Sequence, residues 1–148
     1  MIVATVTDPA VLAFTIPLAP RGKGSVRTGK GRTFTDSASR SWMATVAQFA
    51  AAAHRGRPPM EGPLELGVVA VMPRPKRLMR KSDPDGLVWC PSKPACANIV
   101  KAVCDGMRSV WRDDAQLSRL GVEKFYAEKT GTPRVEVACR PLREESIR

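Results

Sequence analysis

Histidine and paired cysteines are largely missing from this sequence. His54 is its single histidine, and its four cysteines form no C-x-x-C pair and no regular framework. Structural zinc sites need closely spaced Cys or His ligands, so a zinc site is not expected. A disulfide is not expected either, and Cys96 and Cys104 are interpreted as small buried hydrophobic residues in a reducing compartment.

Acidic residues are also scarce. The 148 residues include 14 Asp and Glu against 24 Lys and Arg, which gives a net charge of +10. Such an excess favours a polyanionic partner, first of all nucleic acid, over a basic surface with no partner. The apolar N-terminal stretch lacks a basic flank and is interrupted by Asp8, Pro9 and Pro17, so neither a signal peptide nor a membrane span is expected. We expect the protein to stay inside the cell.

The length suits one domain with its own hydrophobic core. Apolar periodicity predicts one α+β domain with a small mixed sheet and two main helices, in the order β-α-β-α-β-β. The last two strands are expected to form a hairpin around the turn K-T-G-T-P, and the tail is expected to fray from about residue 141. The expected elements are a strand at 11–18, a helix from Asp36 or Ser37 to His54, a central strand at 64–72, a helix at 94–108, and strands at 117–127 and 134–139. In the strand at 117–127, the expected inward positions are Leu120, Val122 and Phe125.

Basic residues gather in two segments that contain no acid. Glycine lets a backbone approach a phosphate closely, and Lys and Arg neutralise its charge, so both segments are expected to contact DNA phosphates. A nucleotide-binding loop is disfavoured because no G-K-[ST] follows the glycines. The surrounding loops, 21–32 and 73–93, are expected to be flexible and without regular structure. The residues concerned are Arg21, Lys23, Arg27, Lys30 and Arg32 in the first segment and Arg74, Lys76, Arg77, Arg80 and Lys81 in the second. Trp89, in the second loop, is either a packing residue, which we prefer, or a platform for base stacking.

The stretch P-A-C-A-N-I-V-K-A-V-C-D, residues 94–105, carries the clearest functional pattern. Between its apolar positions, Asn98, Lys101 and Asp105 share a polar edge of the expected helix. The following W-R-D-D-A-Q brings two adjacent carboxylates, Asp113 and Asp114, which repel each other unless a cation lies near them.

These residues resemble the motif of the RusA family of Holliday junction resolvases, small endonucleases of bacteriophages and prophages. That motif reads roughly P-D-x-D-N-x-x-K-x-x-x-D and, after a short gap, W-x-D-D-A-Q. The resemblance implies the same fold for nearly the whole chain, a homodimer, a four-way junction or other branched DNA as partner, and a bacterial cytoplasm as location. The matching residues are Pro94, Asn98, Lys101, Asp105, Trp111, Asp113, Asp114, Ala115 and Gln116.

One departure from the motif is large. Where the family has its first two aspartates, this chain has Ala95 and Ala97. The resemblance implies that acids at these positions and Asp114 would together hold Mg²⁺ at the scissile phosphate. It also implies that Lys101 neutralises charge on the phosphate or orients water, and that Asp113 supports the site. With two ligands lost, the chain is expected to bind junctions without cutting them.

The two alanines have alternative explanations. In the first, which we prefer, a structure-selective nuclease has been disarmed by exchanging two aspartates for alanine. In the second, the chain is a natural phage protein that binds branched DNA and has no catalytic activity. The plain view that alanines only favour a helix leaves the rest of the motif unexplained.

Overall fold

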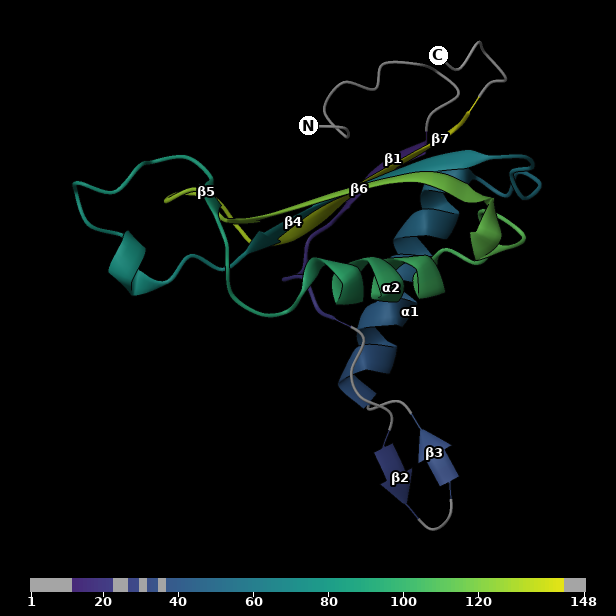
Figure 1. Cartoon of the computed structure of the whole chain (residues 1–148), viewed down its shortest axis with the longest axis horizontal. Coiled ribbons are helices and arrows are strands. Elements are labelled where there is room, and N and C mark those ends of the chain that lie inside the picture. The colour runs from purple at the N-terminus through teal and green to yellow at the C-terminus, as the bar shows by residue number, and fades with distance from the viewer. Residues whose placement is uncertain (1–11, 23–26, 30–31, 35–36, 143–148) are drawn as a thin grey trace.

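The computed structural model describes residues 12–22, 27–29, 32–34 and 37–142, and Figure 1 shows how their elements are arranged. Two short 3₁₀ turns, Lys76–Leu78 and Asp114–Gln116, lie among them. The chain runs through β1 (Leu12–Ile16), β2 (Arg27–Gly29), β3 (Arg32–Phe34), α1 (Ser37–His54), β4 (Leu64–Met72), β5 (Val88–Trp89), α2 (Cys96–Gly106), β6 (Leu117–Tyr126) and β7 (Arg134–Pro141).

The main sheet has five strands in the order β1-β7-β4-β6-β5. Its central strand is β4, which pairs parallel with β6 and antiparallel with β7. The first eight residues of β4 are buried, as expected for an apolar strand with neighbours on both sides. The α+β class and the central place of this strand are therefore confirmed.

The expected hairpin of the last two strands is wrong, because β4 lies between β6 and β7. The link at 127–133 needs to span only two strand spacings, roughly 10 Å, which seven residues do easily. The alternation along β6 was also misread. Leu120 is 51% exposed, and Phe125 is buried in a small cluster with Val69, Val71 and Ala127, separate from the main core.

Both helices pack on one face of the sheet (Figure 1). The main core lies between them and the sheet and includes Val46, Leu66, Val68, Ile99 and Val103. The first helix has the expected bounds. The second is shorter than expected at both ends, because Ala95 has an extended backbone (φ −67°, ψ 147°) and the residues after Gly106 form turns.

Both basic loops contain regular structure, which corrects the expectation of none. Within the first, β2 and β3 form a separate antiparallel pair that projects near the start of α1 (Figure 1). The second, residues 73–93, is called the arm here because it extends beyond the sheet in Figure 1. The arm contains the turn Lys76–Leu78 and the strand β5, which pairs with β6. Among the described residues, no helix is long and apolar enough to cross a membrane.

Candidate functional site

The start of α2 carries Ala95 and Ala97, the two positions at which the chain differs from the family motif. Ala95 is the N-cap residue and makes no side-chain capping bond, and the first turn of the helix contains no acid. Ala97 and Asn98 are exposed beside it, and Lys101 is exposed one turn further along. By helical spacing, Ala97, Lys101 and Cys104 lie along one face of α2.

A lysine from the sheet fixes the chain that enters this helix. The ammonium Nζ of Lys124, on β6, donates to the carbonyl oxygen of Ser92 and to that of Pro94, the latter at 2.6 Å. The Ser92 hydroxyl is 2.8 Å from the Tyr126 hydroxyl. The first residues of α2 are therefore held to the sheet by side chains, which sets the position of Ala95.

The first basic segment begins beside the same helix end. A Cβ added to Gly22 would lie 3.0 Å from the Cβ atoms of both Pro94 and Asn98, so this backbone passes in contact with the start of α2. Arg21, which directly precedes Gly22, is exposed, and its Nε donates to the Ser39 hydroxyl at 3.3 Å. A phosphate near α2 would therefore meet the beginning of this segment.

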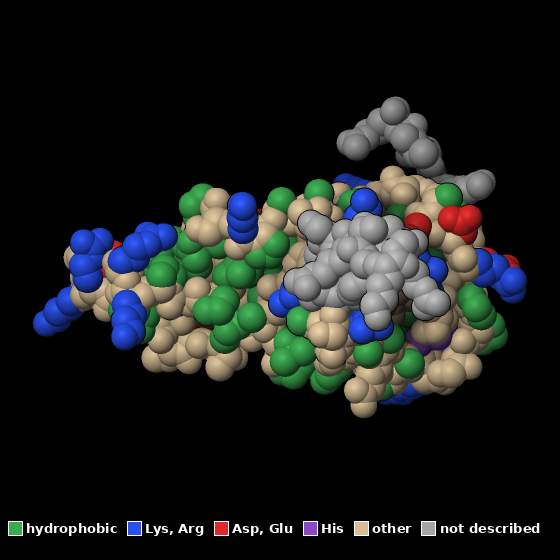
Figure 2. Space-filling view, turned by 90° about the horizontal axis from the view of Figure 1, so that it is seen from below, with side chains coloured by type: hydrophobic (Ala, Val, Ile, Leu, Met, Phe, Trp, Pro, Cys, Tyr) green, Lys and Arg blue, Asp and Glu red, His purple; other side chains and the backbone are tan. Residues whose placement is uncertain are grey.

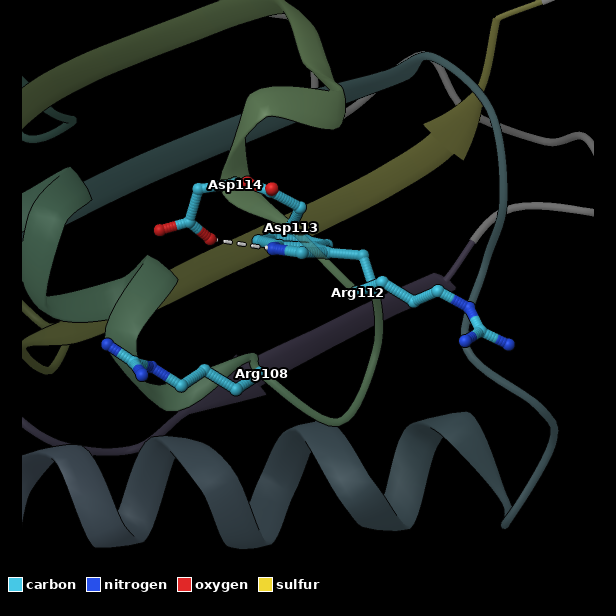
Figure 3. Close-up of a pocket in the computed structure, with 5 residues that line it drawn as sticks. Arg108, Arg112, Asp113 and Asp114 are labelled. Carbon is cyan, nitrogen blue, oxygen red and sulfur yellow. Dashed lines mark hydrogen bonds between the residues drawn. The ribbon is translucent and has the colours of Figure 1, made fainter.

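The motif W-R-D-D-A-Q forms a rigid turn that presents one acid. Trp111 is 1% exposed, and its indole Nε1 donates to Asp114 Oδ1 at 2.8 Å, the bond dashed in Figure 3. Asp113 caps the turn Asp114–Gln116 by accepting from the Ala115 backbone N–H at 2.8 Å. The Gln116 side chain accepts from the backbone N–H of Asp113 and donates to the carbonyl of Met60.

The two adjacent acids thus have different surroundings. The carboxylate of Asp113 is occupied by the turn, whereas Oδ2 of Asp114 has no hydrogen-bond donor among the residues that the structure describes. Asp114 lies close to α2. Burial, then the charges of Asp114 and of Asp105, raise the pKa of the Cys104 thiol to about 12. Asp114 therefore lies near Cys104, which follows Lys101 by about one turn of α2.

A hollow of about 240 Å³ opens beside Asp114 and is lined by Arg108, Trp111, Arg112, Asp113 and Asp114. Figure 3 shows Arg108 and Arg112 reaching out from the segments before the acid pair. Arg108 pairs with Asp105 at 3.5 Å, and Arg112 lies 3.9 Å from Glu61. These two arginines are not among the residues expected from the sequence. The spacing R-S-V-W-R directly before two acids was the available signal.

The residues present do not fit a magnesium site. Mg²⁺ prefers several oxygen ligands in octahedral geometry, and carboxylates normally supply the protein's share. Ala95 and Ala97 offer no side-chain oxygen, which leaves the carboxylate of Asp114. Over the described ranges, no group of three or more His, Cys, Asp or Glu side chains is placed to hold a metal ion.

The arm is held together by Arg74. Its guanidinium donates to the carbonyl oxygens of Leu78 (2.9 Å), Pro84 (2.5 Å), Gly86 (2.8 Å) and Ala127 (3.3 Å). This side chain is therefore part of the scaffold of the arm, whatever it contributes to DNA binding.

The other four basic residues of the arm, Lys76, Arg77, Arg80 and Lys81, are exposed, and Figure 2 shows Lys and Arg side chains crowded at one end of the molecule. Arg80 is hydrogen-bonded to Asp83, which lowers the pKa of that carboxyl. In the first segment, Lys23 and Lys30 lie outside the described residues. Arg27 and Arg32 lie in β2 and β3, and their phosphate contacts stay a prediction.

Two comparisons with known proteins agree with the motif. A family model described as Endodeoxyribonuclease RusA matches residues 16–140. The curated protein YqaN of Bacillus subtilis (strain 168), itself described as uncharacterized, is 32% identical over 128 residues, covering 82% of this chain and 87% of YqaN. The match to the family model includes α1, α2 and the segment that joins α2 to β6. The chain belongs to the RusA family of endodeoxyribonucleases, whose function is the resolution of Holliday junctions.

Proposed function

We propose that this chain binds four-way DNA junctions but does not cut them. The observation that carries the proposal is the pair of alanines at the start of α2, in a site whose other parts are intact. Trp111, Gln116 and Lys124 still hold Asp114 and the start of α2 in place. Because a divalent metal does not fit the residues present, we derive no hydrolytic step for this chain.

The capping of α2 supports the proposal that acids belong at these positions. Alanine is among the poorest N-cap residues and aspartate is among the best, because a carboxylate accepts from the free N–H groups of the first turn. The positive end of the helix dipole would also stabilise a carboxylate at position 95. An alanine in a position that favours aspartate is what the loss of a functional carboxylate leaves behind.

The DNA would lie along the exposed basic residues near α2. We assign phosphate contacts to the first segment, which starts beside Asn98, and to the exposed lysines and arginines of the arm. Lys101 would meet a phosphate at the centre of this surface, since it is exposed on α2 about one turn before Cys104, which lies near Asp114. Arg108 and Arg112, at the hollow beside Asp114, would bind the phosphate next to it.

A four-way junction has near two-fold symmetry, so we propose that two copies bind it as a two-fold dimer, one at each of the paired cleavage positions. Each copy would bring its own basic segments, and the combined positive surface suits the open form of a junction. A DNA partner of this kind would place the protein in the cytoplasm of a bacterial host, encoded by a phage or prophage.

Restoring the acids tests this proposal. We expect the chain as given to bind an end-labelled immobile junction without nicking it in Mg²⁺. We expect the double variant Ala95→Asp/Ala97→Asp to make paired nicks. Either single variant should recover little, because ligands of one ion act as a unit. The double variant with Asp114→Asn added is the control and should be inactive.

Binding without Mg²⁺ gives a second readout. The chain as given should bind junctions at least as tightly as the double variant, because the added carboxylates face the phosphates and repel them. Cleavage by the chain as given would overturn the proposal. A folded, junction-binding double variant that does not nick would favour the natural binding protein over the disarmed nuclease.

A further inference from the structure

An aromatic pair lies where the arm joins the sheet. Trp89, on β5, is opposite Phe125 of β6, and their rings are stacked with centroids 4.5 Å apart at 27°. Phe125 is 8% exposed and packs with Val69 and Val71, whereas Trp89 is 65% exposed. Phe125 covers one face of the indole, so the large exposed fraction leaves the other face open. The two sequence-based alternatives for Trp89, packing and stacking, are therefore compatible.

Trp89 differs from the other two tryptophans of the chain. Trp42 and Trp111 are 6% and 1% exposed, and each indole N–H has an acceptor, the carbonyl of Ala19 and the carboxylate of Asp114. For Trp89, no hydrogen-bond partner is found among the residues that the structure describes. A large apolar ring, fixed from behind and open in front, is the arrangement that base stacking requires.

The arm that leads to Trp89 is basic. It contributes Lys76, Arg77 and Lys81, all exposed, and Arg77 lies 5.9 Å from the centroid of the Tyr126 ring, which points to the other face of β6 from Phe125. A second copy of this chain would bring an equally basic arm, and the two arms would repel each other. A polyanion that carries aromatic bases fits this surface better than a protein does.

The platform is also close to the candidate site. Pro94 follows Trp89 by five positions, and an extended chain of five residue steps reaches at most about 18 Å. Bonds from Lys124 hold this link to β6, since its backbone carbonyl accepts from the Cys90 N–H and its ammonium binds the Pro94 carbonyl. On duplex DNA, about 18 Å corresponds to about five base-pair steps. A strand that passes α2 and rounds the β5 edge of the sheet would reach Trp89, which lies with Phe125 on the face away from the helices, within a few nucleotides.

From these observations we infer that Trp89 is a stacking platform for an unpaired or unstacked DNA base, extending the stack of Phe125 and Trp89 by one member. The inference rests on the proposed function and names the feature of the junction that Trp89 would recognise. Inside a duplex each base is covered on both faces, whereas at a branch point a base face is open. Stacking on Trp89 thus favours branched DNA, and phosphate contacts alone do not.

The experiment compares Trp89→Ala and Trp89→Phe with the control Leu120→Ala, which truncates another exposed apolar residue on the opposite face of the sheet. Each protein is titrated into an immobile four-way junction and into a duplex of the same arm sequence at one salt concentration. We expect Trp89→Ala to weaken junction binding by about 5- to 150-fold, the range for the loss of one stacked base. Duplex binding should change less than about twofold, and Trp89→Phe should fall between.

A second measurement uses the unmodified chain. Because Trp42 and Trp111 are buried, acrylamide quenching of its fluorescence reports mainly Trp89, and the junction should protect this residue more than the duplex does. Equal loss of junction and duplex binding in Trp89→Ala, or unchanged junction binding, would overturn the inference. A sedimentation coefficient of Trp89→Ala that differs from that of the unmodified chain would also overturn it, because it would indicate that Trp89 contacts protein and not DNA. If the unmodified chain does not prefer junctions to duplex, the proposed function itself fails. If it does and Trp89→Ala keeps the preference, only this inference fails.

Discussion

Arg74 and Arg77 have the same charge and lie three residues apart, but the structure gives them different contacts. Arg74 donates to four backbone carbonyls, among them Leu78 and Ala127 in partly buried positions. Arg77 is exposed, and its described polar contact is a 3.4 Å bond to the Tyr126 hydroxyl. Replacing each by glutamine separates the scaffold of the arm from phosphate binding.

The size of the effect follows from the bonds. The two partly buried bonds of Arg74 involve a charged donor and contribute about 1.5 kcal/mol each, and we leave out the two exposed ones because water competes for them. Arg74→Gln should therefore make opening of the arm easier by about 3 kcal/mol, which is roughly a 100-fold increase in amide hydrogen exchange over residues 74–90. Arg77→Gln should leave this exchange unchanged.

The salt dependence of DNA binding should show the opposite order. Arg77→Gln removes one phosphate contact and should reduce the slope of log K against log salt by about 0.9. Arg74→Gln should reduce it less, because its guanidinium is already engaged by carbonyls. Exchange is measured by mass spectrometry, and the slope by titrating duplex at several salt concentrations. If Arg74→Gln leaves exchange unaltered and lowers the slope as much as Arg77→Gln, Arg74 is a phosphate contact and our account of the arm is wrong.

Two further predictions concern the helices. At pH 8, iodoacetamide should label Cys96 and spare Cys104 in the folded protein, because a thiol with a pKa of about 12 is ionised in roughly one molecule in ten thousand; comparable labelling of both by mass spectrometry would contradict this. Gly106→Ala should destabilise the fold by about 1–3 kcal/mol in urea unfolding, since its Cβ would lie 2.6 Å from Cγ1 of Val46 on α1. Gly86→Ala, which meets nothing within 4 Å, is the matched control, and an equal loss there would refute the packing argument.

The order of the main elements was predictable from local patterns, but the short strands β2, β3 and β5 and one pairing were not. An apolar run that is buried on both faces requires a neighbour on each side, and this placed β4 at the centre. The turn residues between β6 and β7 indicate only that the chain reverses direction. They do not distinguish a β7 that pairs directly with β6 from a β7 that lies beyond β4, so the expected hairpin is wrong. The regular structure of the arm was not predictable from local patterns either, because it depends on Arg74 bonds to carbonyls as distant in the sequence as that of Ala127.

The site shows the same division between local and long-range information. The motif alone predicted Lys101 and the acid pair as site residues, and it suggested that two adjacent carboxylates need a cation nearby. In the structure, backbone and indole N–H groups stabilise them instead, with Asp113 capping a turn and Asp114 bound to Trp111. None of these bonds comes from positions 95 and 97, which are exposed at the start of α2. The hydrogen bonds that position Asp114 are therefore formed in a chain with alanine at both positions, and under the proposed function the two alanines would remove metal ligands without disturbing this turn.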